Sequence, residues 1–305
     1  IMTKNFTWNT SVTLSHNKNS VKQLTGEEVQ LWEANFGYSQ NTHIIGINQP
    51  LGQMYGYITE GLYQVSDFDY DATTQTYTLK DGIPYAGDKA NVKPGMWKFK
   101  NVDGSEDNKI TEEDKTVIGN AYPKFYGGIN NTFTYKDFDL SIFLTYSFGN
   151  DVLNATKLTN TKTALQNKNV LAAADSHNRW VLVNKSGELI TDPQEMAEIN
   201  RGKTVAAIYD NEVGDTYIHS WAVEDGSFLK LSNITLGYTF PKKIIEKIGI
   251  SKLRLYATGS NLLTWTKYSG FDPEVSTMGN GLTPGVDFGA YPKSRSFVFG
   301  INLAF

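Results

Sequence analysis

Cysteine is absent from the 305 residues of this chain. Its absence excludes a disulfide scaffold, a thiolate zinc site and a cysteine nucleophile. Long apolar runs are absent as well: the longest extend over only a few residues, whereas a membrane-spanning helix needs about 20. Disulfide-rich proteins and helical membrane proteins are therefore excluded.

Charge is also scarce, because charged residues form 20% of the chain, against a usual ~25%. The 28 Lys and Arg residues are scattered, and the formal net charge is −4. Nucleic-acid binding requires clustered positive charge, so no nucleic-acid partner is expected. Aromatic residues, by contrast, reach 13%. This combination favours a β protein.

The chain starts without an initiator Met at position 1 and without a signal peptide, since Ile1 leads directly into a sequence typical of a strand. We therefore expect a fragment or a processed piece of a longer protein. Targeting information then lies outside these residues.

Large apolar residues alternate with small or polar residues, most clearly at the end of the chain. Every odd position from Phe297 to Phe305 is large and apolar, and the even positions carry Ser, Val, Gly, Asn and Ala. A period of two predicts a strand with one apolar face. Strands are expected at approximately 5–15, 125–135, 137–148, 228–240, 252–265 and 295–305.

These strands are long, at roughly 9–13 residues against a usual five or six. Tilted strands of about 9–11 residues cross a bilayer in a barrel. Their second face carries Ser, Thr, Asn and Gly, and aromatic residues gather at the strand ends, as in the aromatic girdles of outer-membrane barrels. The pattern predicts an all-β fold, an antiparallel transmembrane β-barrel segment. The alternative is a soluble β-sandwich that binds glycan.

The connections between the strands alternate between short and long. Tyr135-Lys136-Asp137 predicts a hairpin turn of about three residues, and 241–249 predicts a short helix between Pro241 and Gly249. Barrels of this kind place short turns in the periplasm and long loops outside. Helix 241–249 is therefore expected in the periplasm, and the long extracellular loops are expected at 16–124, 149–227 and 266–294.

Six strands leave no room for a lumen, and an open sheet would leave its edges unpaired in lipid. Further strands must therefore come from sequence beyond these residues.

Several segments resemble the SusC/RagA family of TonB-dependent outer-membrane transporters. Residues 229–241 (LKLSNITLGYTFP), 253–262 (LRLYATGSNL) and 270–274 (GFDPE) resemble its C-terminal signature, and 52–62 and 117–125 fit as well. The terminal Phe305 resembles the signal that the barrel-assembly machinery reads. Taken together, the similar segments extend over nearly the whole chain.

The resemblance implies that residues 1–305 are the C-terminal part of a barrel of about 22 strands, without its plug domain and TonB-contacting segment. It implies a SusD-like surface lipoprotein and TonB as partners, and outer-membrane lipid around the barrel. The implied function is energy-coupled import of oligosaccharides or peptides. The chain is accordingly not expected to be an enzyme.

One acidic segment, 103–114, has the spacing of a calcium loop of the EF-hand type, since oxygen ligands recur along 12 residues. Asn108 replaces the usual turn glycine, and the last position is an Asp rather than a bidentate Glu, which shortens its reach. The alternative is an acidic turn that caps a short helix, with Thr111 as N-cap. The candidate ligands of Ca²⁺ are Asp103, Ser105, Asp107, Lys109 through its carbonyl, Thr111 and Asp114.

Other candidate sites carry less information. Asp67, Asp69 and Asp71 are more simply explained as a solvated hairpin arm than as a second cation site. The four histidines lack the spacing of zinc ligands, and no catalytic fingerprint occurs. Loop aromatic residues suit either sugar stacking or the anchoring of loops to one another: Trp32, Tyr55, Tyr57, Trp97, Trp180 and Trp221.

Overall fold

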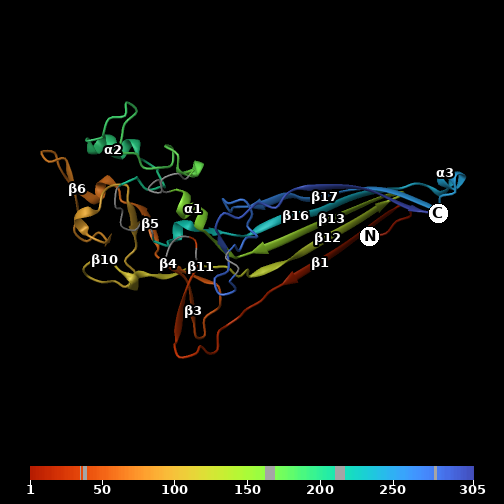
Figure 1. Cartoon of the computed structure of the whole chain (residues 1–305), viewed down its shortest axis with the longest axis horizontal. Coiled ribbons are helices and arrows are strands. Elements are labelled where there is room, and N and C mark those ends of the chain that lie inside the picture. The colour runs from red at the N-terminus through yellow and green to blue at the C-terminus, as the bar shows by residue number, and fades with distance from the viewer. Residues whose placement is uncertain (35, 37–39, 162–168, 210–216, 278–279) are drawn as a thin grey trace.

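The computed structural model describes residues 1–34, 36, 40–161, 169–209, 217–277 and 280–305. The molecule is elongated, with a long sheet at one end and a region of folded loops at the other (Figure 1). The two termini lie at the end of the sheet that is remote from the loops. No helix among the described residues is long and apolar enough to span a membrane.

Six long strands form a single antiparallel sheet in the order β1-β12-β13-β16-β17-β19. The ranges expected from the sequence differ from their bounds by no more than one residue at either end. The strands are β1 (Phe6–Ser15), β12 (Phe125–Tyr135), β13 (Phe138–Phe148), β16 (Phe228–Thr239), β17 (Lys252–Thr266) and β19 (Ser296–Ala304).

The register of the sheet places most large apolar residues of the six strands on one face, named here the apolar face; Phe143 and Val298 are exceptions that lie on the opposite face. Residues that are paired directly with one another across the six strands include Trp8, Phe133, Leu140, Leu236, Ala257 and Phe299. A second row near the termini begins with the aromatic residues Phe6, Tyr135, Phe138 and Tyr238. This second row matches an aromatic girdle at a membrane interface.

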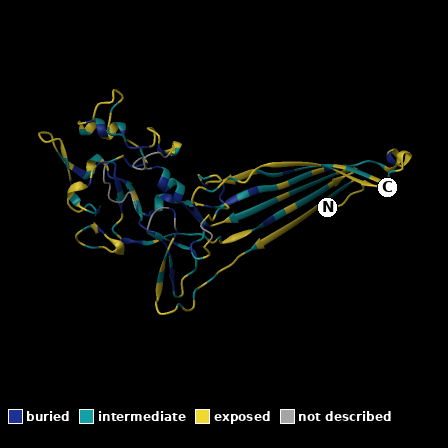
Figure 2. Cartoon of the chain, in the orientation of Figure 1, coloured by how far each residue is buried: buried dark blue, intermediate teal, exposed yellow. Residues whose placement is uncertain are grey.

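The apolar face is open, because Leu14 is 67% exposed and Phe299 is 80% exposed. The three buried hydrophobic clusters of the described residues contain none of the six long strands. Figure 2 shows the same contrast, since dark blue buried segments are concentrated in the loop region. The alternative of a β-sandwich is therefore wrong: no second layer covers the apolar residues of the described sheet.

The opposite face, named here the polar face, carries mainly hydroxyl and amide side chains. One row across it consists of Asn9, Thr132, Ser141, Thr235, Thr258 and Val298. Asp139 and Arg254 form a two-pronged ion pair here, with N–O distances of 2.9 and 2.6 Å. Gly237 lies between them on β16, and its missing side chain leaves room for the pair.

The connection between β12 and β13 is tighter than expected. Tyr135 pairs with Phe138, so the turn has only the two residues Lys136 and Asp137, and Lys136 has a φ of 52°. The expected turn of about three residues is wrong by one, because Tyr135 still belongs to the ladder. A two-residue loop is the commonest hairpin connection.

The expected helix at 241–249 consists of two short pieces, α3 (Lys242–Ile245) and η6 (Glu246–Ile248). Pro241 is the N-cap residue rather than the first helical residue, and Gly249 ends the segment with a φ of 74°. The piece protrudes beyond the sheet at the end that bears the termini (Figure 1). Its side of the membrane stays a prediction.

The loop region is built from short strands and helical turns. The first long connection contains β2 (Val29–Glu33), β3 (Asn41–Gly46), β4 (Gln53–Gly56), β5 (Thr59–Leu62), η1 (Val65–Asp67), β6 (Phe68–Asp71), β7 (Thr76–Leu79), β8 (Tyr85–Ala86), η2 (Lys89–Asn91), β9 (Trp97–Phe99), β10 (Lys109–Ile110), η3 (Glu112–Asp114) and β11 (Thr116–Asn120). The later connections contain β14 (Asp151–Asn154), α1 (Ala155–Asn160), η4 (Ala172–Ala174), α2 (Pro193–Ile199), η5 (Ser220–Ala222), β15 (Val223–Asp225) and β18 (Val286–Asp287).

Aromatic residues hold these connections together. Tyr57, Trp97 and Trp180 are buried in one cluster, and the Tyr57 ring stacks on Tyr217 with 4.5 Å between ring centroids. Gly95 passes close to the indole, because a Cβ there would lie 2.5 Å from the Trp180 ring. The aromatic residues at these positions anchor loops to one another.

Candidate functional site

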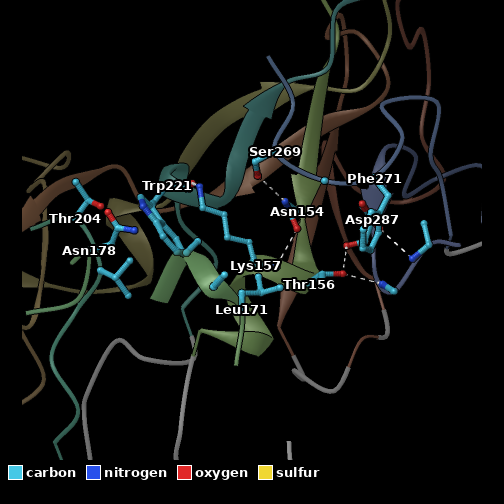
Figure 3. A pocket seen from close by; sticks show the side chains of 16 residues that line it. Asn154, Thr156, Lys157, Leu171, Asn178, Thr204, Trp221, Ser269, Phe271 and Asp287 are labelled. Atoms are coloured by element: carbon cyan, nitrogen blue, oxygen red, sulfur yellow. Dashed lines mark hydrogen bonds between the residues drawn. The ribbon is translucent and has the colours of Figure 1, made fainter. Parts of the chain in front are cut away.

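A pocket of about 510 Å³ lies in the loop region. Its walls come from separate parts of the chain: 154–157 at the start of α1, 171–173 with part of η4, Asn178, 204–205, 269–271 and 287–290 (Figure 3). Trp221 lines it as well. Pockets of this size that are lined mainly by apolar groups are the usual form of a ligand site.

Asn154 positions one wall of the pocket. It ends β14 and is the N-cap residue of α1, where its side-chain oxygen accepts a hydrogen bond from the Lys157 N–H at 2.8 Å. This bond satisfies one of the free donors of the first helical turn. It starts the helix at the point where Thr156 and Lys157 line the pocket.

Lys157 is held by Glu224 and Trp221. Its Nζ lies 3.0 Å from the Glu224 carboxylate and 4.0 Å from the centroid of the Trp221 ring. Burial opposes the ionisation of Glu224, but hydrogen bonds from Ser269 and the charge of Lys157 outweigh it, so the pKa of Glu224 is lowered. The pair is therefore ionised, and its charges cancel within the wall.

Asp287 anchors the opposite wall. The Tyr268 hydroxyl donates to its carboxylate at 2.5 Å, and burial together with this bond raises the pKa of Tyr268. The Gly289 N–H donates to the Thr156 hydroxyl at 2.8 Å, which ties the wall to α1. Strands β18 and β14 also pair in parallel. The two walls therefore form one connected unit.

An ion network fastens the same connection to the long sheet. Lys230 on β16 is 3% exposed and contacts the carboxylates of Asp272 and Glu274, and Lys293 contacts Glu274 at 2.7 Å. Burial works against the charge of Glu274, but the two lysines lower its pKa. The acidic residues of the 270–274 motif thus hold the pocket-bearing connection against the polar face.

His43 on β3 makes a further link to this connection. Its Nε2 donates to the Pro284 carbonyl at 3.0 Å, and its Nδ1 lies 2.9 Å from the Thr42 hydroxyl. Burial lowers the pKa of His43 to about 4, although the bond to Pro284 partly opposes the shift. The neutral ring is a structural tie between two connections.

The segment 103–114 forms the cap that the sequence offers as an alternative to a calcium loop. Thr111 is the N-cap of η3, and the Asp114 carboxylate accepts from the N–H groups of Thr111 and Val102, both at 2.7 Å. Asp103 and Asp107 accept from the N–H groups of Ser105 and Lys109. In the described part of the chain no three His, Asp or Glu side chains converge as they would around a metal ion. Calcium binding stays a prediction.

The remaining candidates lie apart from the pocket. Asp69 and Asp71 lie on β6 of the β6–β7 hairpin, and Asp67 faces Lys98 at 3.4 Å. Phe305 follows β19 and is 90% exposed. Of the loop aromatic residues named from the sequence, Trp221 is the one that lines the pocket.

The sequence did not point to the pocket itself. Its walls come from segments more than 100 residues apart, such as Thr156 and Gly289, and no local spacing links them. One local signal exists: the 270–274 motif, which carries the family resemblance, overlaps residues 269–271 of the wall.

No protein-family model matches this chain. It is 30% identical over 312 residues to the TonB-dependent receptor P3 of Formosa agariphila and 26% identical over 309 residues to the TonB-dependent receptor SusC of Bacteroides thetaiotaomicron. Each match covers all of this chain, which spans 27% and 25% of the two relatives.

Solved structures share the fold. The chain matches the RagAB peptide transporter with a TM-score of 0.64 and 20% identity, over 100% of this chain and 28% of that one. The closed-closed state of the RagAB peptide importer matches with a TM-score of 0.60.

The long antiparallel strands and the exposed apolar face define an outer-membrane β-barrel segment, and the solved structures confirm this fold. The relatives confirm the resemblance to the SusC/RagA family of TonB-dependent transporters and the localisation in the outer membrane. Their names describe receptors and transporters, which supports a role other than catalysis.

Proposed function

We propose that this chain forms part of the barrel wall and the outer loops of a TonB-dependent importer of oligosaccharides or peptides. The observation that carries the proposal is the sheet, whose six strands turn every apolar stripe to one uncovered face. A lipid environment is the one in which such a face is stable. The similarity of the whole chain to TonB-dependent receptors supplies the energy-coupling part of the proposal.

The two regions of the chain have different roles in the proposed importer. The sheet separates lipid from a polar interior lined by hydroxyl groups and the Asp139–Arg254 pair. The loop region carries the pocket at a place where cargo passes before it enters the barrel. The polar face then offers a hydrated path lined mainly by hydroxyl and amide groups.

Two partners complete the proposed importer. A SusD-like lipoprotein would dock on the long loops and retain cargo above them, and TonB would act through a part of the protein beyond residues 1–305. The relatives support this arrangement, because one is named SusC and the similar structures are those of the RagAB peptide transporter.

Uptake by cells tests the proposal. The intact protein is expressed with its neighbouring lipoprotein, and accumulation of a fluorescent peptide and a fluorescent oligosaccharide is measured with and without TonB. Accumulation of one of them should require both the protein and TonB. Uptake that continues unchanged after TonB is depleted would contradict the proposal.

A further inference from the structure

We propose that the pocket between α1, η4, residues 269–271 and residues 287–290 binds an apolar side chain of a peptide. The inference rests on the proposed import function and names the chemistry of the cargo at this site. It is drawn from the charges, the hydrogen bonds and the surface of the described walls.

Neither charged residue of the described walls is available to a charged ligand. Lys157 is neutralised by Glu224 at 3.0 Å and covers the Trp221 ring at 4.0 Å. Asp287 accepts from the Tyr268 hydroxyl and from the Ala290 N–H, and it is 4% exposed. A ligand carboxylate or ammonium group would lose its hydration here without gaining an opposite charge.

The polar groups beside α1 are also engaged. Thr156 bonds Gly289, Ser269 bonds Glu224, and the Asn154 side chain caps α1. Sugar hydroxyl groups that entered between them would exchange bonds to water for few new bonds, which is unfavourable. This chemistry disfavours an oligosaccharide as the group that fills the pocket.

The rest of the surface suits an apolar group. Leu171, Ala172, Ala173 and Val205 line it with no side-chain polar atom, and Phe271, which is 78% exposed, lines it next to Asp287 (Figure 3). An apolar side chain that leaves water and covers Phe271 gains free energy in proportion to the apolar area buried. Asn178 and Thr204 lie together at one side, as Figure 3 shows, and the Asn178 side-chain amide already donates to Asp175 at 3.3 Å.

The pocket is formed before the ligand arrives. The β14–β18 pairing, the bond from Gly289 to Thr156 and the network around Lys230 hold the two sides in place. Binding therefore does not have to order these described segments, which lowers its entropic cost.

The test uses the intact receptor purified with its lipoprotein. The probes are a peptide of Gly and Ser with one central Leu, the same peptide with Ser in place of Leu, and a neutral linear glucan. Calorimetry should show that the Leu peptide binds about tenfold more tightly than the Ser peptide, as expected for burying one Leu side chain. A173W fills the pocket and should reduce this preference to about twofold or less. A72W, on the exposed turn of the β6–β7 hairpin, should leave it unchanged.

A second pair of variants covers the case in which A173W does not fold. F271S removes an exposed aromatic side chain from the pocket and should weaken binding of the Leu peptide about threefold. Y291S removes an exposed aromatic side chain that does not line the pocket and should have no effect. Equal binding of the two peptides would overturn the inference, as would glucan binding that A173W abolishes.

The inference and the proposed function fail in different ways. If TonB depletion leaves uptake unchanged but the Leu preference persists in the purified receptor, the import proposal fails and the site stands. If uptake depends on TonB but the Leu preference is absent, the site fails and the import proposal stands.

Discussion

Two phenylalanines show how differently the two regions of the molecule treat apolar side chains. Phe99 in the loop region is completely buried, whereas Phe299 on the apolar face of the sheet is 80% exposed. Both lie on strands, so the difference is not one of secondary structure. The loop region gathers its aromatic residues inward as a water-soluble domain does. The sheet presents them to a solvent that is itself apolar.

The comparison teaches that the driving force for folding differs between the regions. In the loop region the removal of apolar surface from water stabilises the packed clusters. In lipid that gain is absent between side chains, and backbone hydrogen bonds must all be made within the sheet. The long strands therefore contribute hydrogen-bonded ladders, which shift register only near Ser232, and the loop region contributes packing.

The largest expected effect on stability comes from removing one Phe ring from each of the two regions. F99A should destabilise the loop region by about 3–5 kcal/mol, because it leaves a cavity in a buried cluster. F299A leaves no such cavity and should change the same transition by less than about 0.5 kcal/mol. Urea unfolding of the intact protein in detergent, followed by near-UV circular dichroism, measures both. Equal losses would break the comparison.

A charge placed on each face of one strand gives the next effect. L236R puts Arg on the apolar face of β16 and should cost about 2–4 kcal/mol of folding into lipid. N233R puts the same charge on the polar face of that strand, next to Ser260, and should be tolerated. The readout is the yield of folded barrel in vesicles. A defect in N233R that matched that of L236R would reverse the assignment of the faces.

The strands of the sheet could be predicted from the sequence because each of them shows the same local pattern, the alternation of apolar and polar residues over about ten positions. Trp8, Leu140 and Phe299 share a face for that reason, and the ladder then aligns them. The turn at Lys136 is one residue shorter than the sequence predicts, since no local signal shows at which residue two strands stop pairing.

The structure of the loop region could not be predicted from the sequence in the same way. Its strands have two to six residues, and several of them pair with distant partners, as Tyr85 does with Lys109. The pocket depends on contacts such as Thr156 with Gly289, and the sequence carries no spacing for them. The capping role of Thr111 was foreseen because it is local.

Replacing a glycine by alanine on each face of the sheet should have a smaller effect on stability. A Cβ at Gly237 on the polar face would lie 2.3 Å from Arg254 Nη2 and 2.5 Å from Asp139 Oδ1. G237A should therefore separate the ion pair and cost about 1–2 kcal/mol. At Gly259, on the apolar face, the nearest atom is the Leu262 side-chain end at 2.9 Å, which can rotate away.

G259A is thus the matched control and should cost about 0.5 kcal/mol or less. Unfolding in denaturant with the barrel in detergent measures both variants. If G259A proves as destabilising as G237A, the lost stability comes from crowding within the strand and not from separation of the Asp139–Arg254 pair.

The smallest effect concerns the pH dependence of the loop region. The pKa of Glu224 is lowered in the folded state, against about 4.3 for an unperturbed Glu. Its carboxylate therefore adds stability above about pH 4.3, and this contribution is lost as the pH falls through the lower folded pKa. The wild type should lose about 1 kcal/mol between about pH 5 and pH 3 through this group.

E224Q removes the titration but keeps the shape of the side chain. It should be less stable than the wild type near pH 7 and should approach it near pH 3, because the wild-type carboxyl is then also neutral. E106Q, at an exposed acidic position, should follow the wild type throughout. Near-UV circular dichroism measures the melting of the loops across this pH range. If the Lys157–Glu224 pair causes the loss of stability, the loss should occur in the wild type and in E106Q but not in E224Q.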